Sequence, residues 1–172
     1  MRPHSRQILT VEETFGANGC HCELVEGRDV LRAGFEAHHT RVDLIAQAHP
    51  QLNALSVVSE TPMRLSEDHL PVLLELLARA NKQLTLGGFE YDLDRAMIVF
   101  RITNLFERER FDSDIVSSMV HCAIAELDRI VPYAAIVRNT PADLLEDLDL
   151  QRLLMREDVI PPMPGDAEEE EY

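Results

Sequence analysis

The 172-residue chain has no tryptophan, only three cysteines and no long run of apolar residues. A membrane-spanning helix needs about 20 consecutive apolar residues, so we expect none here. Three cysteines are an odd number without the spacing of a disulfide framework, which favours a reducing compartment. The first residues also lack the apolar core of a signal peptide. We therefore predict a cytoplasmic protein.

Positive charge is scarce as well: 16 Lys and Arg residues face 31 Asp and Glu residues, which leaves a net charge of −15. Nucleic-acid binding requires clustered basic residues that neutralise phosphates, and anionic membrane surfaces require the same. We therefore predict neither a nucleic-acid nor a membrane partner. Apolar residues make up 45% of the chain, and a domain of this length can bury a sizeable core.

Motifs of known catalytic chemistry are missing. The sequence contains no Gly-x-Ser-x-Gly, no glycine-rich phosphate loop and no His-Glu-x-x-His. Two pairs of carboxylates stand close in sequence, Asp92 with Asp94 and Asp112 with Asp114. The first pair falls in an expected turn and the second at an expected helix start, where the local backbone favours Asp. We predict a protein that is not an enzyme, with no catalytic residue and no cofactor.

The acidic residues concentrate at the C-terminus, where positions 139–172 carry 11 acidic and 2 basic residues. This change in composition divides the chain into three parts. Residues 1–138 form an α+β domain, residues 139–160 an appended acidic amphipathic helix, and residues 161–172 a disordered acidic tail.

The first half of the domain shows strand patterns after one short helix, which we expect over Arg6–Thr14 and which ends at two nearby glycines. Apolar residues then alternate with polar ones, as in an antiparallel meander with one buried face. The expected strands are Cys20–Val25, Val30–His38, Arg41–Ala48 and Ala54–Ser59.

The second half alternates long helices with a strand pair. One helix begins with Ser66 as its N-cap and reaches about Leu84, with a core stripe of Leu70, Leu73, Leu74, Leu77 and Leu84. Two strands follow over Leu86–Tyr91 and Met97–Leu105.

Asp112 then starts another helix, which Pro132 closes or kinks and in which Cys122 lies on the apolar face. The core positions expected in that helix are Ile115, Met119, Cys122, Leu127 and Ile130. A last helix runs from Thr140, with Pro141 at its first position, to about Met155.

Four motifs in this order of elements resemble the YbjN family of bacterial sensory transduction regulators: Asn81, Leu86–Asp92, Ile98–Arg101 and Asp128–Tyr133. The resemblance covers residues 6–138. It implies the α+β fold of type III secretion chaperones, α-βββ-α-ββ-α, in which a curved antiparallel sheet packs against helices. It also implies a homodimer without enzymatic activity. The extra C-terminal helix has no counterpart in the family.

The central helix carries more apolar surface than one core requires. Val72, Leu76 and Ala80 lie to one side of its core stripe. We expect these three residues to form the interface of a homodimer. The alternative is that a loop or the N-terminal helix of the same chain covers them.

The expected C-terminal helix is amphipathic, with Leu144, Leu145 and Leu148 among acidic residues. Such a helix can bind in a groove of another protein or pack on its own domain, and the sequence leaves both possibilities open. If it binds a partner, these three leucines form the contact.

The predicted function is that of a noncatalytic protein-binding module with a chaperone-like or regulatory role, acting as a homodimer on an unknown protein client. An extended client segment would gain main-chain hydrogen bonds and apolar pockets on the sheet-and-helix surface. The alternative is a small-molecule or metal sensor that uses Cys20 and Cys22 with nearby histidines, or a pocket between sheet and helices. A Cys-x-Cys pair on a strand separates its sulfurs, however, and zinc sites usually have longer spacings.

Overall fold

A computed structural model describes residues 3–107 and 111–156. Its elements confirm the predicted α+β class and the four strands expected before the central helix, where the resemblance implied three. Short helical turns, marked η, occur at two places. In chain order they are α1 (Arg6–Ala17), β1 (Cys22–Leu24), β2 (Val30–Glu36), β3 (Arg41–His49), η1 (Pro50–Leu52), β4 (Ala54–Pro62), α2 (His69–Asn81), β5 (Gly88–Asp92), β6 (Met97–Leu105), α3 (Ser113–Asn139), η2 (Ala142–Asp147) and α4 (Leu150–Leu153).

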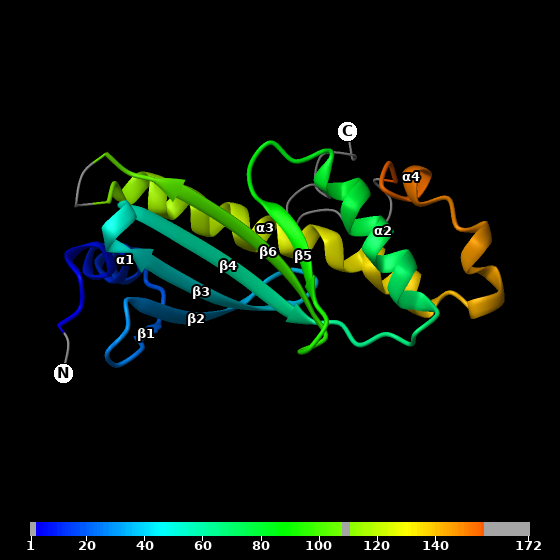
Figure 1. Cartoon of the computed structure of the whole chain (residues 1–172), viewed down its shortest axis with the longest axis horizontal. Helices are drawn as coiled ribbons and strands as arrows, with labels where there is room; N and C mark the ends of the chain where they lie inside the picture. The colour runs from blue at the N-terminus through cyan, green and yellow to red at the C-terminus, as the bar shows by residue number, and fades with distance from the viewer. Residues whose placement is uncertain (1–2, 108–110, 157–172) are drawn as a thin grey trace, which may run out of the picture.

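The six strands form one antiparallel sheet in the order β1-β2-β3-β4-β6-β5. Helices α1 and α3 lie against one face of this sheet, α1 over β1 to β3 and α3 over β3, β4 and β6 (Figure 1). Helix α2 packs against β5 and α3 at the other end of the molecule, next to η2 and α4. No helix in the described part of the chain is both long enough and apolar enough to cross a bilayer.

The strand alternation points the expected side chains into the core. On β3, Val42, Leu44, Ala46 and Ala48 are all buried, whereas the residues between them are exposed or half-buried. Leu31 of β2 is fully buried as well. The predicted meander with one buried face is therefore confirmed, although β1 and β2 are shorter than the sequence suggested.

The predicted N-cap residue is confirmed for α3 but not for α2. Asp112 is the N-cap of α3, because its carboxylate accepts hydrogen bonds from the backbone N–H groups of Asp114 and Ile115. Ser66 is not the N-cap of α2: the chain makes a turn first, and Asp68 takes the cap position without a side-chain hydrogen bond. The helix also ends at Asn81 rather than at Leu84.

The turn between α2 and β5 gives a structural role to Asn81, the first family motif, and to Gly87 of the second. Gly87 has a φ of +74°, and a Cβ atom there would lie 2.5 Å from Phe100 Cζ and 2.8 Å from the carbonyl oxygen of Arg101. Asn81 holds the incoming strand, because its amide nitrogen donates to the carbonyl oxygen of Phe89 at 3.0 Å and its amide oxygen accepts from the Phe89 N–H at 2.7 Å. The glycine thus permits the turn, and the asparagine fixes the outer edge of β5.

Helix α3 continues through Pro132 to Asn139, so the proline neither ends the helix nor begins a new one. Its buried face is rotated slightly from the predicted one: Val116 is buried, whereas Ile115 is 43% exposed. Cys122, expected in the core, is only half-buried. Burial and the nearby Glu126 carboxylate raise the pKa of the Cys122 thiol.

The segment after α3 is not the single helix predicted from Thr140 to Met155. Thr140 caps the end of α3, and η2 and α4 then follow as two short helices. Both pack back onto α2, and Leu150 and Leu153 of α4 join the core. The buried leucines of this segment are Leu145, Leu150, Leu153 and Leu154. The predicted tail, residues 161–172, lies outside the described residues.

Candidate functional site

Helix α2 does not present the predicted dimer surface. Leu76 and Ala80 are fully buried inside the single subunit, where they continue the stripe of Leu73 and Leu77. Val72 is half-buried and lies beside η2 and α4. The prediction that these residues remain available for a second copy is therefore wrong for Leu76 and Ala80. The homodimer itself stays a prediction, and it needs another surface.

The three leucines predicted to bind a partner differ in how exposed they are. Leu145 is buried and Leu148 is partly buried against the core of the domain, whereas Leu144 is 49% exposed. The segment is therefore docked on its own domain. Leu145 and Leu148 are occupied in that contact and are not available to a partner in this conformation.

The cysteines and histidines suggested as metal ligands do not converge. Cys22 pairs with Ala33 in the sheet, and the Cys20 thiol donates to the carbonyl oxygen of Asn18 at 3.7 Å. Burial, together with the Glu12 carboxylate and Cys20, raises the pKa of the Cys22 thiol, which favours the protonated form over the thiolate that binds metals. Within the described residues, no group of three His, Cys, Asp or Glu side chains is placed to hold a metal ion.

A half-buried polar cluster that the sequence did not reveal connects the β2–β3 turn to α3. One carboxylate oxygen of Asp128 accepts from the backbone N–H groups of His39 at 2.7 Å and Thr40 at 3.2 Å. Its other oxygen lies 2.8 Å from His39 Nδ1. Asp128 and His39 form an ion pair when His39 is protonated. Asp128 begins the last family motif. This geometry gives that position a structural role.

A Ser–His contact lies at the start of α2. The backbone carbonyl of Thr140 can only accept, so His69 Nε2 donates to it at 2.8 Å, and neutral His69 then accepts from the Ser66 hydroxyl through Nδ1 at 2.6 Å. A base oriented in this way can activate a hydroxyl group. Here the pair is exposed and local, and its two bonds tie the start of α2 to the end of α3. Its evident role is to join these two helices.

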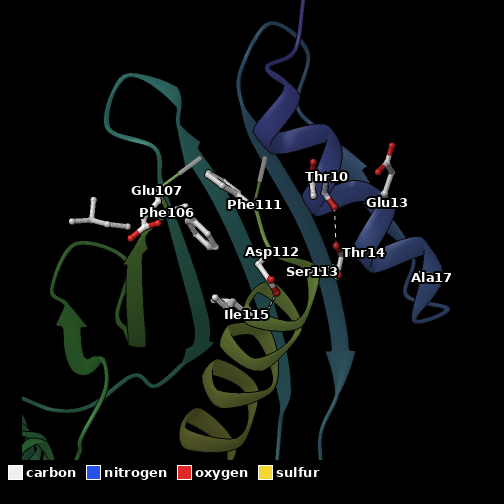
Figure 2. Close-up of a pocket in the computed structure, with 11 residues that line it drawn as sticks. Thr10, Glu13, Thr14, Ala17, Phe106, Glu107, Phe111, Asp112, Ser113 and Ile115 are labelled. Atoms are coloured by element: carbon white, nitrogen blue, oxygen red, sulfur yellow. Dashed lines mark hydrogen bonds between the residues drawn. The ribbon is translucent and has the colours of Figure 1, made fainter. Parts of the chain in front are cut away.

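A wide groove lies at the opposite end of the molecule, where α1, the end of β6 and the start of α3 meet (Figure 2). We call it the α1–α3 groove; its volume is about 790 Å³. Thr10, Glu13 and Thr14 of α1 form one side, and Phe106, Phe111 and Ile115 lie on the other. The remaining lining residues are Ala17, Leu105, Glu107, Asp112 and Ser113.

Three of the polar side chains that line the α1–α3 groove have hydrogen-bond partners within the chain. The hydroxyls of Thr10 and Thr14 donate to backbone carbonyls of their own helix, at 3.1 and 2.8 Å, and Asp112 caps α3. The rings of Phe106 and Phe111 stack with centroids 4.3 Å apart. Beside them Leu105 is 72% exposed. This arrangement offers apolar contact area with acidic groups beside it.

A smaller groove continues from the first along β6, and the two share Ile115. We call it the β6-edge groove; its volume is about 290 Å³. It is lined mostly by apolar atoms from β6 and α3 and by Leu86, which is 63% exposed. The other lining residues are Ile102, Thr103, Asn104, Asp114, Ser118, Met119 and Cys122. The sequence placed these residues in separate elements and could not show that they meet.

Two arginines on the sheet face away from the helices are engaged in ion pairs. Arg95 binds the carboxylate of the buried Glu60 through both terminal nitrogens, at 2.7 and 2.5 Å. Arg101 contacts both carboxylate oxygens of Glu90. The bonded carboxylate raises the pKa of each guanidinium. These cations are therefore already compensated within the chain.

Comparisons with known proteins agree with this architecture. A family model described as "YbjN: Putative bacterial sensory transduction regulator" matches residues 9–135. The crystal structure of "YbjN, a putative transcription regulator from E. coli" is similar with a TM-score of 0.56 and 10% identity, over 75% of this chain and 91% of that one. At this identity the similarity concerns the fold alone.

A second similar structure is the HopA1–SchA chaperone–effector complex, with a TM-score of 0.47 and 9% identity, over 70% of this chain and 88% of that one. A comparison with curated proteins gives no match.

Proposed function

Because this chain belongs to the YbjN family, we propose that it is a noncatalytic, cytoplasmic protein-binding module with a regulatory or chaperone-like role. The family description, a sensory transduction regulator, supports a role that is exercised through another molecule. The acidic surface makes a nucleic acid a poor candidate for that molecule, since the net charge is −15. A polypeptide is the partner that fits.

The observation that carries this proposal is the apolar surface around the end of β6. Leu105 and Ile115 are 72% and 43% exposed, and they border two adjoining grooves instead of standing alone. Single exposed leucines are ordinary on protein surfaces, whereas apolar side chains grouped along a groove are typical of a binding site. A client segment placed there would remove these side chains from water.

Site-specific photo-crosslinking tests the proposal. A photoreactive phenylalanine analogue replaces Leu105 in one variant and Leu93 in another, and both variants are irradiated in the cells that produce the protein. Leu93 is the matched control, because it is 65% exposed but lies in the β5–β6 turn at the other end of these strands.

We expect a discrete protein adduct from position 105 and none from position 93. The adduct is then identified by mass spectrometry, and its binding is reproduced with the two purified proteins. Equal labelling at both positions, or no adduct at position 105, would contradict the proposed binding site.

A further inference from the structure

Strand β6 is longer than the strand that covers its outer side. The pairing of β5 with β6 runs from Asp92–Met97 only as far as Gly88–Arg101, whereas β4 pairs with β6 up to Leu105. The last four residues of β6 therefore have a neighbouring strand on one side only. This short stretch is an open edge on one side of β6, whereas the other side of β6 is paired with β4 along the whole strand.

The direction of the backbone groups on this edge follows from the ladder. Phe106 N–H donates to the Asn53 carbonyl at 2.7 Å, and Met63 N–H donates to the Ala96 carbonyl at 2.9 Å. The backbone N–H and C=O groups of even-numbered β6 residues therefore point toward β4. Those of odd-numbered residues point to the other side of the strand, because the hydrogen-bonding direction alternates along an antiparallel pair. The N–H and C=O groups of Thr103 and Leu105 thus point to the open side, where no backbone partner lies within the described residues.

The β6-edge groove lies directly beside these groups. A strand added next to Thr103 would direct every second side chain toward α3, whose Ile115, Met119 and Cys122 line the groove together with Leu86. The added strand would therefore find main-chain hydrogen bonds and an apolar pocket at the same place, which is the combination used in strand addition.

The rim of the two joined grooves is acidic. Asp114 borders the β6-edge groove, and Glu13, Glu107 and Asp112 border the α1–α3 groove. The segment 105–115 contains two arginines, but its four acidic residues still leave it net negative. This charge favours an occupant that carries basic residues. It disfavours a second copy of the chain, whose own net charge is −15.

We propose that the open edge of β6 receives an extended segment of a client protein as an additional strand, with apolar side chains at alternate positions and Lys or Arg beside them. This inference rests on the proposed function, because it specifies the kind of polypeptide and the way it binds. In this proposal Thr103 and Leu105 make the main-chain contact, and Ile115, Met119 and Cys122 in the β6-edge groove make the side-chain contact.

The test uses the full chain and a random library of linear peptides of about ten residues, long enough to span the edge. Peptides selected on the wild-type protein are sequenced, and their affinities are measured for Thr103→Pro and Thr103→Ala. Proline removes the outward N–H of residue 103 and leaves the bonds to β4 intact, since a strand edge tolerates proline on its unpaired side. Alanine is the matched control, because both variants lose the 2.8 Å contact between the hydroxyls of Thr103 and Ser56.

We expect selected peptides with apolar residues two positions apart and with basic neighbours. Thr103→Pro should weaken their binding at least about tenfold relative to Thr103→Ala, because the hydrogen bond donated by residue 103 is lost and the ring obstructs the added strand. Circular dichroism and the urea midpoint of both variants show that the fold is retained, and Leu105→Pro provides a second test of the same edge if Thr103→Pro fails to fold.

Other results would overturn the inference. Equal peptide affinity of the proline and alanine variants would mean that binding does not use the edge, although the proposed protein-binding role would stand. A wild-type dimer that Thr103→Pro converts to a monomer would mean that a second copy occupies the edge. Failure to select any peptide, together with no adduct at position 105, would reject both the inference and the proposed function.

Discussion

Gly87 is the residue at which a single methyl group should cost most. Its φ of +74° is unfavourable for any residue with a Cβ atom, and such an atom would also collide with the Phe100 ring and the Arg101 carbonyl oxygen. Gly27 provides the matched control, because its φ of +70° is nearly the same but no atom lies within 4 Å of its Cβ position.

We therefore predict that Gly27→Ala lowers the free energy of unfolding by about 1 kcal/mol, from backbone strain alone. Gly87→Ala should lower it by about 2 kcal/mol more, because the neighbouring backbone must also move. Urea denaturation of both variants measures the difference. Equal losses would show that the turn before β5 can relax around the methyl group.

Two of the three cysteines, Cys22 and Cys122, allow a prediction about pH. Desolvation raises the pKa of the Cys22 and Cys122 thiols, and nearby carboxylates add to this effect. A raised pKa means less thiolate at neutral pH, so alkylation by iodoacetamide should be several-fold slower than for the same cysteines in the unfolded chain. The pH midpoint of the alkylation rate, followed by peptide mass spectrometry, should lie higher in the folded protein. A midpoint at or below the unfolded value would contradict the assigned environment of these thiols.

At the scale of the elements, the short helices after α3 should contribute measurably to stability. Leu145 is buried against the domain, whereas its neighbour Leu144 is 49% exposed. We expect Leu145→Ala to lower the free energy of unfolding by about 2–3 kcal/mol and Leu144→Ala to change it by less than about 0.5 kcal/mol. Chemical denaturation tests both. Similar small effects would mean that the segment detaches from the domain before the domain unfolds.

The same segment shows why the sequence predicted the wrong element. A single helix would place Leu145 and Leu150 about 140° apart around its axis, and Leu145 and Leu154 on opposite sides. The break at Leu148 allows all of these leucines to face the domain, and Asp149 starts α4 by accepting from the N–H of Arg152. Leucine spacing records only positions along the chain, so it does not show that tertiary burial favours two short helices over one.

Helix α2 illustrates a related limit. Its apolar residues cover so much of the circumference that the stripe around Leu70 and Leu74 and the stripe around Leu76 and Ala80 are both plausible core faces. The structure buries the second stripe, because η2 and α4 pack on one side of the helix and α3 on the other. The sequence could identify the helix but not the number of neighbours that would cover it.

At the scale of the whole molecule, the order of the elements was predictable because each strand and each long helix has its own periodic pattern. The open edge of β6 was not predictable. It arises from the difference in length between β5 and β6, and its groove is completed by α3 and by Leu86 from the turn before β5. A site built from three separated segments leaves no local signal in any one of them.

The net charge of −15 leads to a last prediction about the molecule as a whole. Like charges destabilise a compact state more than an expanded one, and salt screens this repulsion. Raising NaCl from ~20 mM to ~300 mM should therefore raise Tm, by about 3 °C if screening contributes about 1 kcal/mol.

A chain that ends at Arg156 provides the control, because it lacks seven of the acidic residues and retains all of the basic ones. In that chain the Arg156 oxygen that accepts from the Tyr133 hydroxyl belongs to the terminal carboxylate and can still accept. Its increase in Tm should be clearly smaller, whereas equal increases in both chains, measured by differential scanning calorimetry, would show that the C-terminal carboxylates do not act on the folded domain.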